Sequence, residues 1–453
     1  MNTALWNRIL AFDLDTPLSE YGFSTRLASE NYWTKKFTES AILEYKKFMY
    51  LAGTSEFMVS PSEIVDAVWH QHLIFTQSYT DFCNIIGKQI QHVPSTHNKE
   101  EFDKFRPAKE RTRRLYEANF GEELKEIWEY ATMYDSLDLP KAKLKIRTFI
   151  LLGVFAFVML LIPFYFLLKP IYIHINNPDF ILGFISVAAL TFILLEAYNK
   201  TYLGAVVKQF HEHSFIYHLR PFELVYLKTQ KLANVIHGTI NQLVEDKILH
   251  VNHDFTVENT RNLKASTIEE HHVLNTLHAL GTVHYPLLLK HLMQKPVFRN
   301  MANCMDAFKK YFIKSKVFGK LFYINFVVLA LLITLGLVRY STGLLRDRPV
   351  AQIFMVVAIL TVLAIAYLCR LIGFVCVDTI PKLYQKEILP KKEIENSWQW
   401  QYFLMGSTVL TSSFVPLVNY TNKNENNSTG SCGSSGGSSC GSSCSSCGGC
   451  GGD

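Results

Sequence analysis

Residues 61–95 read PSEIVDAVWHQHLIFTQSYTDFCNIIGKQIQHVPS and hold the densest group of metal-capable side chains outside the carboxyl-terminal tail. These side chains are Asp66, His70, His72, Cys83 and His92. Imidazole, thiolate and carboxylate are the groups that bind zinc and other transition ions in proteins. The stretch therefore predicts a helical domain built around it, and it raises metal binding as a hypothesis.

Apolar residues recur at helical spacing over residues 64–82, which predicts one helix. Ser62 and Glu63 before it suit a helix start, since they satisfy free backbone N–H groups and the helix dipole. Asp66 and His70 stand at i and i+4 on one face, and Trp69 is expected beside them in the buried stripe.

Two interpretations of this face remain open. In the first, Asp66 orients one imidazole nitrogen of His70 and the other nitrogen binds an ion, zinc or another soft metal. His72 points away from His70, so one ion binds both only if the helix breaks, while Cys83 and His92 fold back to complete the site. In the second, which we favour, the Asp66–Trp69–His70 face builds the core, and Cys83 is a small buried apolar side chain.

Residues 1–140 are expected to form a soluble, mainly helical domain. Helical spacing recurs in residues 41–51, and residues 110–134 predict one or two further helices with a break at 120–121. The first fifteen residues lack a basic region followed by a long apolar core, so no signal peptide is expected.

Composition places part of the chain in lipid. Mean hydropathy is +0.10 and 49% of residues are hydrophobic, which is more than an ordinary soluble enzyme needs. The net charge of +6 is modest, and its basic runs stop where apolar segments begin. That pattern is typical of membrane flanks, so the lipid bilayer is the expected partner and nucleic acid is not.

Four apolar segments are each close to the ~20 residues that cross a bilayer core. They are residues 149–168, 180–198, 321–338 and 350–375, and they predict two transmembrane hairpins. Lysines and arginines crowd the start of the first and third segments, so the amino terminus and the central segment are expected to be cytoplasmic in an inner membrane. Arg339, Arg346 and Arg348 in the second link are basic residues on the opposite side, so they weaken the argument for this orientation without reversing it.

A fifth apolar stretch, residues 403–418, contains Ser, Thr, Gly and Pro416 and falls short of a span. We expect residues 376–420 to be amphipathic or membrane-associated. Crossing of the membrane by 403–418 stays open as the alternative, and it would move the tail to the other side.

The central segment, residues 201–319, is expected to be soluble and mainly helical. Residues 220–249 predict two helices, and HVNHDFTVE (250–258) alternates like a short strand ending in a turn. Helix, helix and β-wing is the order of a winged-helix module. Glu245 and Asp246 on the presumed second helix repel phosphate, so a protein-contact or structural role is favoured over DNA binding.

The tail, residues 421–453, is rich in Ser, Gly and Cys and is predicted to be disordered. It holds five of the nine cysteines. Cys444, Cys447 and Cys450 follow a C-x-x-C-x-x-C pattern that presents thiolates to a soft metal. Disulfides, covalent modification and cysteines without any fixed partner are the alternatives.

The front of the chain resembles the amino-terminal domain of the glycine-rich-domain-containing protein family. The resemblance rests on LWNRILAFDLD, RLASENYW, EYKKFMYLA, the signature VDxxWHxHLxxTxxYxxFC and IQHVPS, and it covers about the first 130 residues. The later order of two hairpins around a soluble segment and a Gly/Cys-rich end is similar to a family of uncharacterised bacterial multipass membrane proteins. The resemblance implies no catalytic residue.

We therefore expect a multipass membrane protein whose cytoplasmic helical domains bind protein partners or scaffold an assembly. The sequence shows no complete catalytic motif, which favours a role other than catalysis. The alternative function is metal handling or thiol redox chemistry through the His/Cys cluster and the cysteine-rich tail.

Overall fold

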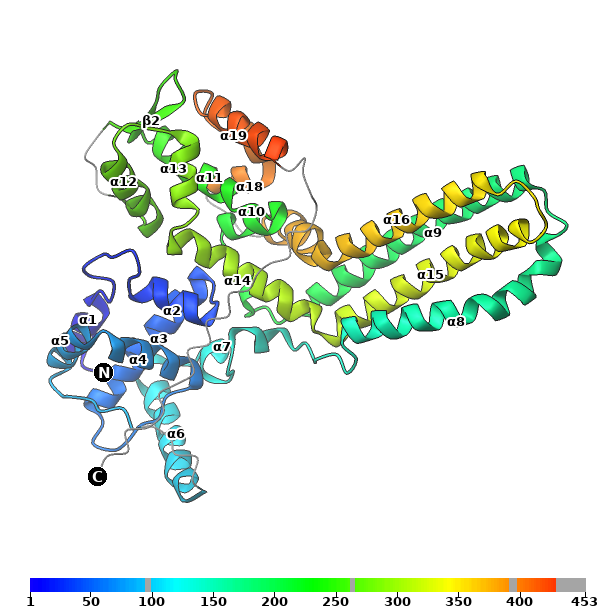
Figure 1. Cartoon of the computed structure of the whole chain (residues 1–453). Coiled ribbons are helices and arrows are strands. Elements are labelled where there is room, and N and C mark those ends of the chain that lie inside the picture. Colours follow the sequence, from blue (N-terminus) through cyan, green and yellow to red (C-terminus); the bar gives the residue numbers. More distant parts are fainter. Residues whose placement is uncertain (94–98, 261–264, 391–396, 429–453) are drawn as a thin grey trace, which may run out of the picture.

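The computed structural model describes residues 1–93, 99–260, 265–390 and 397–428 (Figure 1). It is mainly helical, with three short strands among the described residues, as predicted. Four long apolar helices form a bundle that projects from a part made of shorter helices (Figure 1). We call this part, the described residues of 1–140, 209–315 and 389–428, the soluble half. The tail cysteines, Cys444, Cys447 and Cys450 among them, lie outside the described residues.

Helix α3 (Lys35–Thr54) is the central element of the amino-terminal part. The neighbours that pack on it are α1 (Thr3–Ala11), α2 (Phe23–Asn31), α4 (Glu63–Ile74), α6 (Lys99–Phe120) and α7 (Lys125–Trp128). Glu44 of α3 is fully buried and accepts hydrogen bonds of 2.8 Å from the Tyr116 hydroxyl and the Trp128 indole. The buried carboxylate thereby ties α6 and α7 to α3. The predicted break after Phe120 is confirmed, since Gly121 takes φ +86° there.

The single helix predicted over residues 64–82 is wrong. Helix α4 ends at Ile74, Phe75 leaves the helical region with ψ 65°, and α5 (Thr76–Ile86) continues in a new direction. Packing explains the break, because the Phe75 ring lies edge-on to Phe23 of α2, and α5 then packs on α1 through Phe82 and Phe12. Periodicity alone does not reveal such a turn.

The four predicted apolar spans are confirmed as helices that are long and apolar enough to cross a membrane. They are α8 (Ile146–Tyr172), α9 (Asn177–Lys208), α15 (Lys316–Leu344) and α16 (Ala351–Phe374). Each exceeds the ~20 residues that a bilayer core requires. The last helix continues through two π-type turns and α17 (Ile380–Leu383) as far as Ile388.

Within the bundle, α15 is the central helix. Helix α8 packs mainly on α15, α15 also packs on α16, and α9 contacts both α15 and α16. A Cβ atom at Gly153 of α8 would lie 2.6 Å from the Phe326 ring of α15, so glycine permits this close approach. The side chains of α8 are otherwise largely exposed, as expected of a lipid-facing helix.

The central segment combines helices with a small antiparallel sheet. Its helices are α10 (Pro221–Thr229), α11 (Leu232–Glu245), α12 (Ile268–Leu280), α13 (Tyr285–Leu292) and α14 (Pro296–Ile313), with a 3-10 turn at Phe215–His218. Strands β1 (Leu249–Val251) and β2 (Thr256–Asn259) form a hairpin, and β3 (Val283–His284) adds to β2. The predicted strand and turn are therefore two strands of a three-stranded sheet.

The chain after the fourth span folds back on the central segment. Helix α18 (Trp398–Met405) ends at Gly406, where φ is +67°, and a 3-10 turn (Gly406–Val409) leads to α19 (Val415–Ser428). The Tyr402 hydroxyl donates to the Asn234 carbonyl, and the Thr411 amide donates to the Asn241 side chain. Residues 403–418 thus cover α11 as a broken element, which contradicts the alternative that they cross the membrane.

The amino-terminal part and the central segment share one apolar core. Where the chain enters the bundle, the Ala142 amide donates to the Lys314 carbonyl and the Lys316 amide donates to the Pro140 carbonyl. The starts of α8 and α15 are therefore fixed side by side at the base of the soluble half.

Candidate functional site

The buried residues of α4 form one stripe along the helix: Ile64, Val65, Val68, Trp69, Gln71 and His72. This corrects the prediction that the Asp66–Trp69–His70 face builds the core. Trp69 is buried, but the His70 side chain is 58% exposed and that of Asp66 is 35% exposed. His72 is fully buried. At about 100° per residue, Asp66 and His70 both project from the side of the helix that lies away from this stripe.

His72 is a structural histidine. Its Nδ1 lies 2.7 Å from the Tyr45 hydroxyl and its Nε2 lies 3.1 Å from the Ser78 hydroxyl, so both ring nitrogens are hydrogen-bonded. Burial among aromatic rings lowers the pKa of His72 to about 4. With no free nitrogen, it is not available as a metal ligand in this conformation.

Cys83 also belongs to the core. It lies on α5, is buried, and has a free thiol. Among the described residues, the structure brings it into no group of metal-capable side chains. Of the candidates from the sequence, His72 and Cys83 are therefore packed inside, away from His70 and His92.

Asp66, His70 and His92 do come together. Their ligand atoms all lie within 4.8 Å of one another. His92 Nε2 is 2.8 Å from Asp66 Oδ1, His70 Nε2 is 3.7 Å from Asp66 Oδ2, and the two imidazole rings are 4.4 Å apart. Asp66, which the sequence suggested as an orienting partner of His70, thus stands between both histidines.

The remaining residues of the stretch explain how His92 reaches α4. The Tyr79 hydroxyl of α5 accepts a 3.1 Å hydrogen bond from the Trp69 indole and donates to the Ile90 carbonyl. Ile90 is buried, so the extended segment that follows α5 is held against the core. The Trp69 ring then meets the His92 ring edge-on at 4.6 Å.

Asp66 and His92 lie in the wall of an open groove with a volume of about 990 Å³. Buried Phe48, Trp69 and Ile90 form part of its lining. Phe57 and Met58 also line it, and they are 67% and 46% exposed. Charged groups of both signs share the lining: Glu56, Glu63, Lys88, Arg106, Lys109 and Glu110. An apolar floor with a mixed polar rim is typical of a binding surface.

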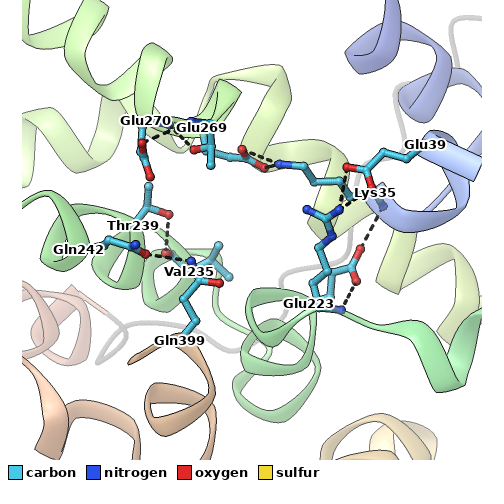
Figure 2. Close-up of polar contacts among 11 residues, drawn as sticks. Lys35, Glu39, Glu223, Val235, Thr239, Gln242, Glu269, Glu270 and Gln399 are labelled. Atoms are coloured by element: carbon cyan, nitrogen blue, oxygen red, sulfur yellow. Dashed lines mark hydrogen bonds and ion pairs between the residues drawn. The ribbon is translucent and has the colours of Figure 1, made fainter. Parts of the chain in front are cut away.

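A second polar site, which sequence reasoning missed, joins the amino-terminal part to the central segment (Figure 2). The Lys35 ammonium contacts both Glu269 oxygens at 2.7 and 2.8 Å, and the Lys35 amide donates to Glu223 at 3.2 Å. Arg220 pairs with Glu39 across the same boundary. We call this network the seam. Its partners are up to 234 residues apart, and no local pattern marks them.

Burial and ion pairing shift the pKa of the seam carboxyl groups in opposite directions. The Glu223 carboxyl is fully buried, and burial raises its pKa although the Arg220 and Lys35 amides donate to it. Burial also acts to raise the pKa of Glu269, but attraction to Lys35 outweighs it and the net pKa is lowered. Glu269 therefore stays ionised and paired.

Several polar side chains of the bundle pair with one another or with backbone carbonyls. Glu196 of α9 lies 3.0 Å from Arg370 of α16, and Asn199 exchanges hydrogen bonds with Asn325 of α15. At the opposite end, Arg339 donates to the carbonyls of Tyr172 and Ile175 at the end of α8. These contacts fit helix packing within the bundle.

In a comparison with known families, one region of the chain matches a family. Residues 22–139 match the UCP032817-like family. The match spans about a quarter of the chain and includes α2 to α7, with the groove and the Asp66, His70 and His92 group. No curated protein and no solved structure matches this chain. The resemblance to glycine-rich-domain-containing proteins stays a prediction.

Proposed function

We propose that this protein is a multipass membrane protein of the inner membrane whose soluble half binds other proteins through the groove beside α4. The observation that carries the proposal is the exposed apolar rim formed by Phe57 and Met58 above a buried aromatic floor. Exposed apolar side chains at the edge of a groove are typical of surfaces that a partner covers.

The proposed topology has two hairpins. Helix α8 crosses the membrane and α9 returns, and α15 and α16 do the same. Residues 1–140 and 201–319 therefore stand on one side of the membrane. The ion pairs of the seam support the proposal, because they require both parts to share a compartment. Lysines at the bundle entry support a cytoplasmic position for that side under the positive-inside rule. Arg339 donates hydrogen bonds to the carbonyls of Tyr172 and Ile175, which reduces its weight as an opposing charge.

The central segment contributes a structural role in this proposal. Helices α10 and α11 and the β1–β2 hairpin follow a winged-helix order. Gln242 of α11 is hydrogen-bonded to Gln399 of α18, and Asn241 is hydrogen-bonded to the Thr411 amide. Because the polar groups of the presumed recognition helix are engaged inside the molecule, nucleic acid is not the proposed partner.

The occupant proposed for the groove is an extended segment of another protein that carries apolar side chains. Phe57 offers a flat apolar face, and its ring also lies 5.2 Å from the Arg111 guanidinium, which holds the loop in place. The charges of both signs around the rim suit hydrogen bonds to a peptide backbone better than they suit a strongly charged ligand.

A photo-crosslinking residue in place of Phe57, in the full-length protein in cells, tests this function. We expect discrete protein adducts that disappear when Met58→Asp is added, since a charge on the rim opposes apolar contact. The control carries the crosslinker at Leu10, an exposed apolar residue of α1 outside the groove. Adducts that form equally at Leu10, persist with Met58→Asp, or fail to form at Phe57 would refute the proposal.

The second candidate function is metal handling. The observation in its favour is the convergence of Asp66, His70 and His92. The redox and metal roles of the tail thiols rest on the sequence alone, because those residues lie outside the described part of the chain.

A further inference from the structure

We propose that Asp66, His70 and His92 form a binding site for one divalent transition-metal ion of the zinc class. The inference does not depend on the partner-binding function proposed above. It differs from the set suggested by the sequence, since Asp66 becomes a ligand while His72 and Cys83 do not.

The distances suit a small ion. In tetrahedral zinc sites, metal–ligand bonds of about 2.1 Å place neighbouring ligand atoms about 3.4 Å apart. The two contacts of Asp66 with the histidines, 2.8 Å and 3.7 Å, lie on either side of that separation. The ligand atoms of all three side chains lie within 4.8 Å of one another, so side-chain rotation can bring them around one ion.

The site is held in place before any ion arrives. Asp66 and His70 stand one turn apart on α4, whose start is capped by the Ser62 hydroxyl accepting from the Val65 amide. The third ligand, His92, is only 14% exposed and is fixed by the Trp69 ring and by the Tyr79 contact to Ile90. Ligands on rigid supports lose little freedom on binding.

A simple ion pair between Asp66 and His92 explains only part of this arrangement. It leaves unexplained why the largely exposed His70 ring lies 4.4 Å from the His92 ring, although other directions are open to it. Two imidazoles and one carboxylate are the protein ligands of open zinc sites, and one shared ion accounts for the approach of all three side chains.

The ligand types select the ion. Imidazole nitrogen suits zinc, cobalt, nickel and iron(II), whereas calcium and magnesium prefer an all-oxygen shell. Three protein ligands leave at least one coordination position for water or another ligand. Asp66 and His92 line the groove, so that open position belongs to the groove.

Cobalt(II) titration of the full-length protein in detergent tests the proposal. The tail is kept, but its five cysteines are replaced by serine so that the tail thiolates cannot bind the probe. We expect one cobalt ion per chain, visible absorption bands without a thiolate charge-transfer band, and displacement by zinc. Asp66→Asn, His70→Gln and His92→Gln should each weaken binding by at least about tenfold.

The matched control is His278→Gln, because His278 is an exposed histidine of α12 outside the ligand group. It should bind cobalt as the parent does. His70→Gln is the decisive variant, since its side chain is largely exposed and its loss leaves the core intact. An unchanged melting temperature of its metal-free form verifies the fold.

Three outcomes overturn the proposal: no bound cobalt at millimolar free ion, equal loss in His278→Gln, or unchanged affinity in His70→Gln. None of these outcomes bears on crosslinking at Phe57, so failure of the metal site and failure of partner binding are told apart.

Discussion

At the scale of single residues, His237 on α11 is a buried histidine with one hydrogen bond. Its Nδ1 lies 2.5 Å from the Tyr285 hydroxyl, and the Phe414 ring lies edge-on to it. Burial, with a smaller contribution from Lys231, lowers the pKa of His237 to about 3. The group is therefore neutral in the folded protein at physiological pH.

This pKa predicts an acid-sensitive central segment. The unfolded chain has a histidine pKa near 6.5, so it takes up a proton more readily than the folded chain as pH falls below that value. Stability is fully present above pH 6.5, and linkage gives a loss of about 2 kcal/mol between pH 7 and pH 5 from His237 alone.

Melting temperatures at pH 7 and pH 5 measure this loss in the full-length protein. His237→Gln keeps a polar side chain without titrating, so we expect a smaller drop between the two pH values than in the parent. His278→Gln, which removes an exposed histidine, should keep the parent's drop. An identical drop in His237→Gln and the parent would argue against this assignment.

Residue roles in the stretch at 61–95 were only partly predictable from the sequence. Val65, Val68, Trp69 and His72 follow a helical stripe that the spacing already contained, and an aromatic-rich core accepts a histidine with two hydroxyl partners. The return of His92 to this face was one of two interpretations of the sequence, and the pattern could not decide between them because the approach to Asp66 depends on the Tyr79 contact with Ile90.

At the scale of elements, the seam joins the start of α3 to α10 and α12. Lys35 stands in the first turn of α3, and Glu269 in the first turn of α12. The Glu269 side chain is only 15% exposed, so this pair is less screened by water than an ordinary surface ion pair. The seam therefore orients the amino-terminal part on the central segment.

Charge exchange across the seam tests that role. Lys35→Glu places a third carboxylate beside Glu223 and Glu269, so we expect faster hydrogen exchange in α2, α3 and α12. The exchanged pair Lys35→Glu with Glu269→Lys should recover part of the protection. Reversal of the exposed pair Arg113–Glu117 on α6 serves as the control and should change little. Equal exchange rates in Lys35→Glu and the parent would contradict the predicted coupling.

The spans show what hydropathy can and cannot predict. Length and apolar character located α8, α9, α15 and α16, but α9 runs ten residues beyond its predicted end and α15 extends five and six residues beyond its predicted limits. They did not reveal that α8 packs mainly on α15, because neighbours are selected by small contacts such as Gly153 with Phe326. The seam was equally unpredictable from the sequence, because its ion pairs join segments that are far apart along the chain.

At the scale of the whole molecule, the soluble half stands at one end of the bundle (Figure 1). The described residues of segments 1–140, 201–319 and 375–428 contact one another there, and the α8–α9 and α15–α16 links lie at the far end (Figure 1). Such an arrangement presents the groove on one side of a membrane only. The proposed binding function requires that side to be the cytoplasm.

Labelling with a membrane-impermeant maleimide tests this central claim most directly. Single cysteines are placed at His174 in the α8–α9 link, at Arg348 in the α15–α16 link, and at His278 in the soluble half, in a full-length chain without other cysteines. All three native side chains are exposed. In cells whose inner membrane is intact and accessible, we predict labelling of His174→Cys and Arg348→Cys, and labelling of His278→Cys only after lysis. Labelling of His278→Cys in intact cells, or protection of either link, would contradict the account.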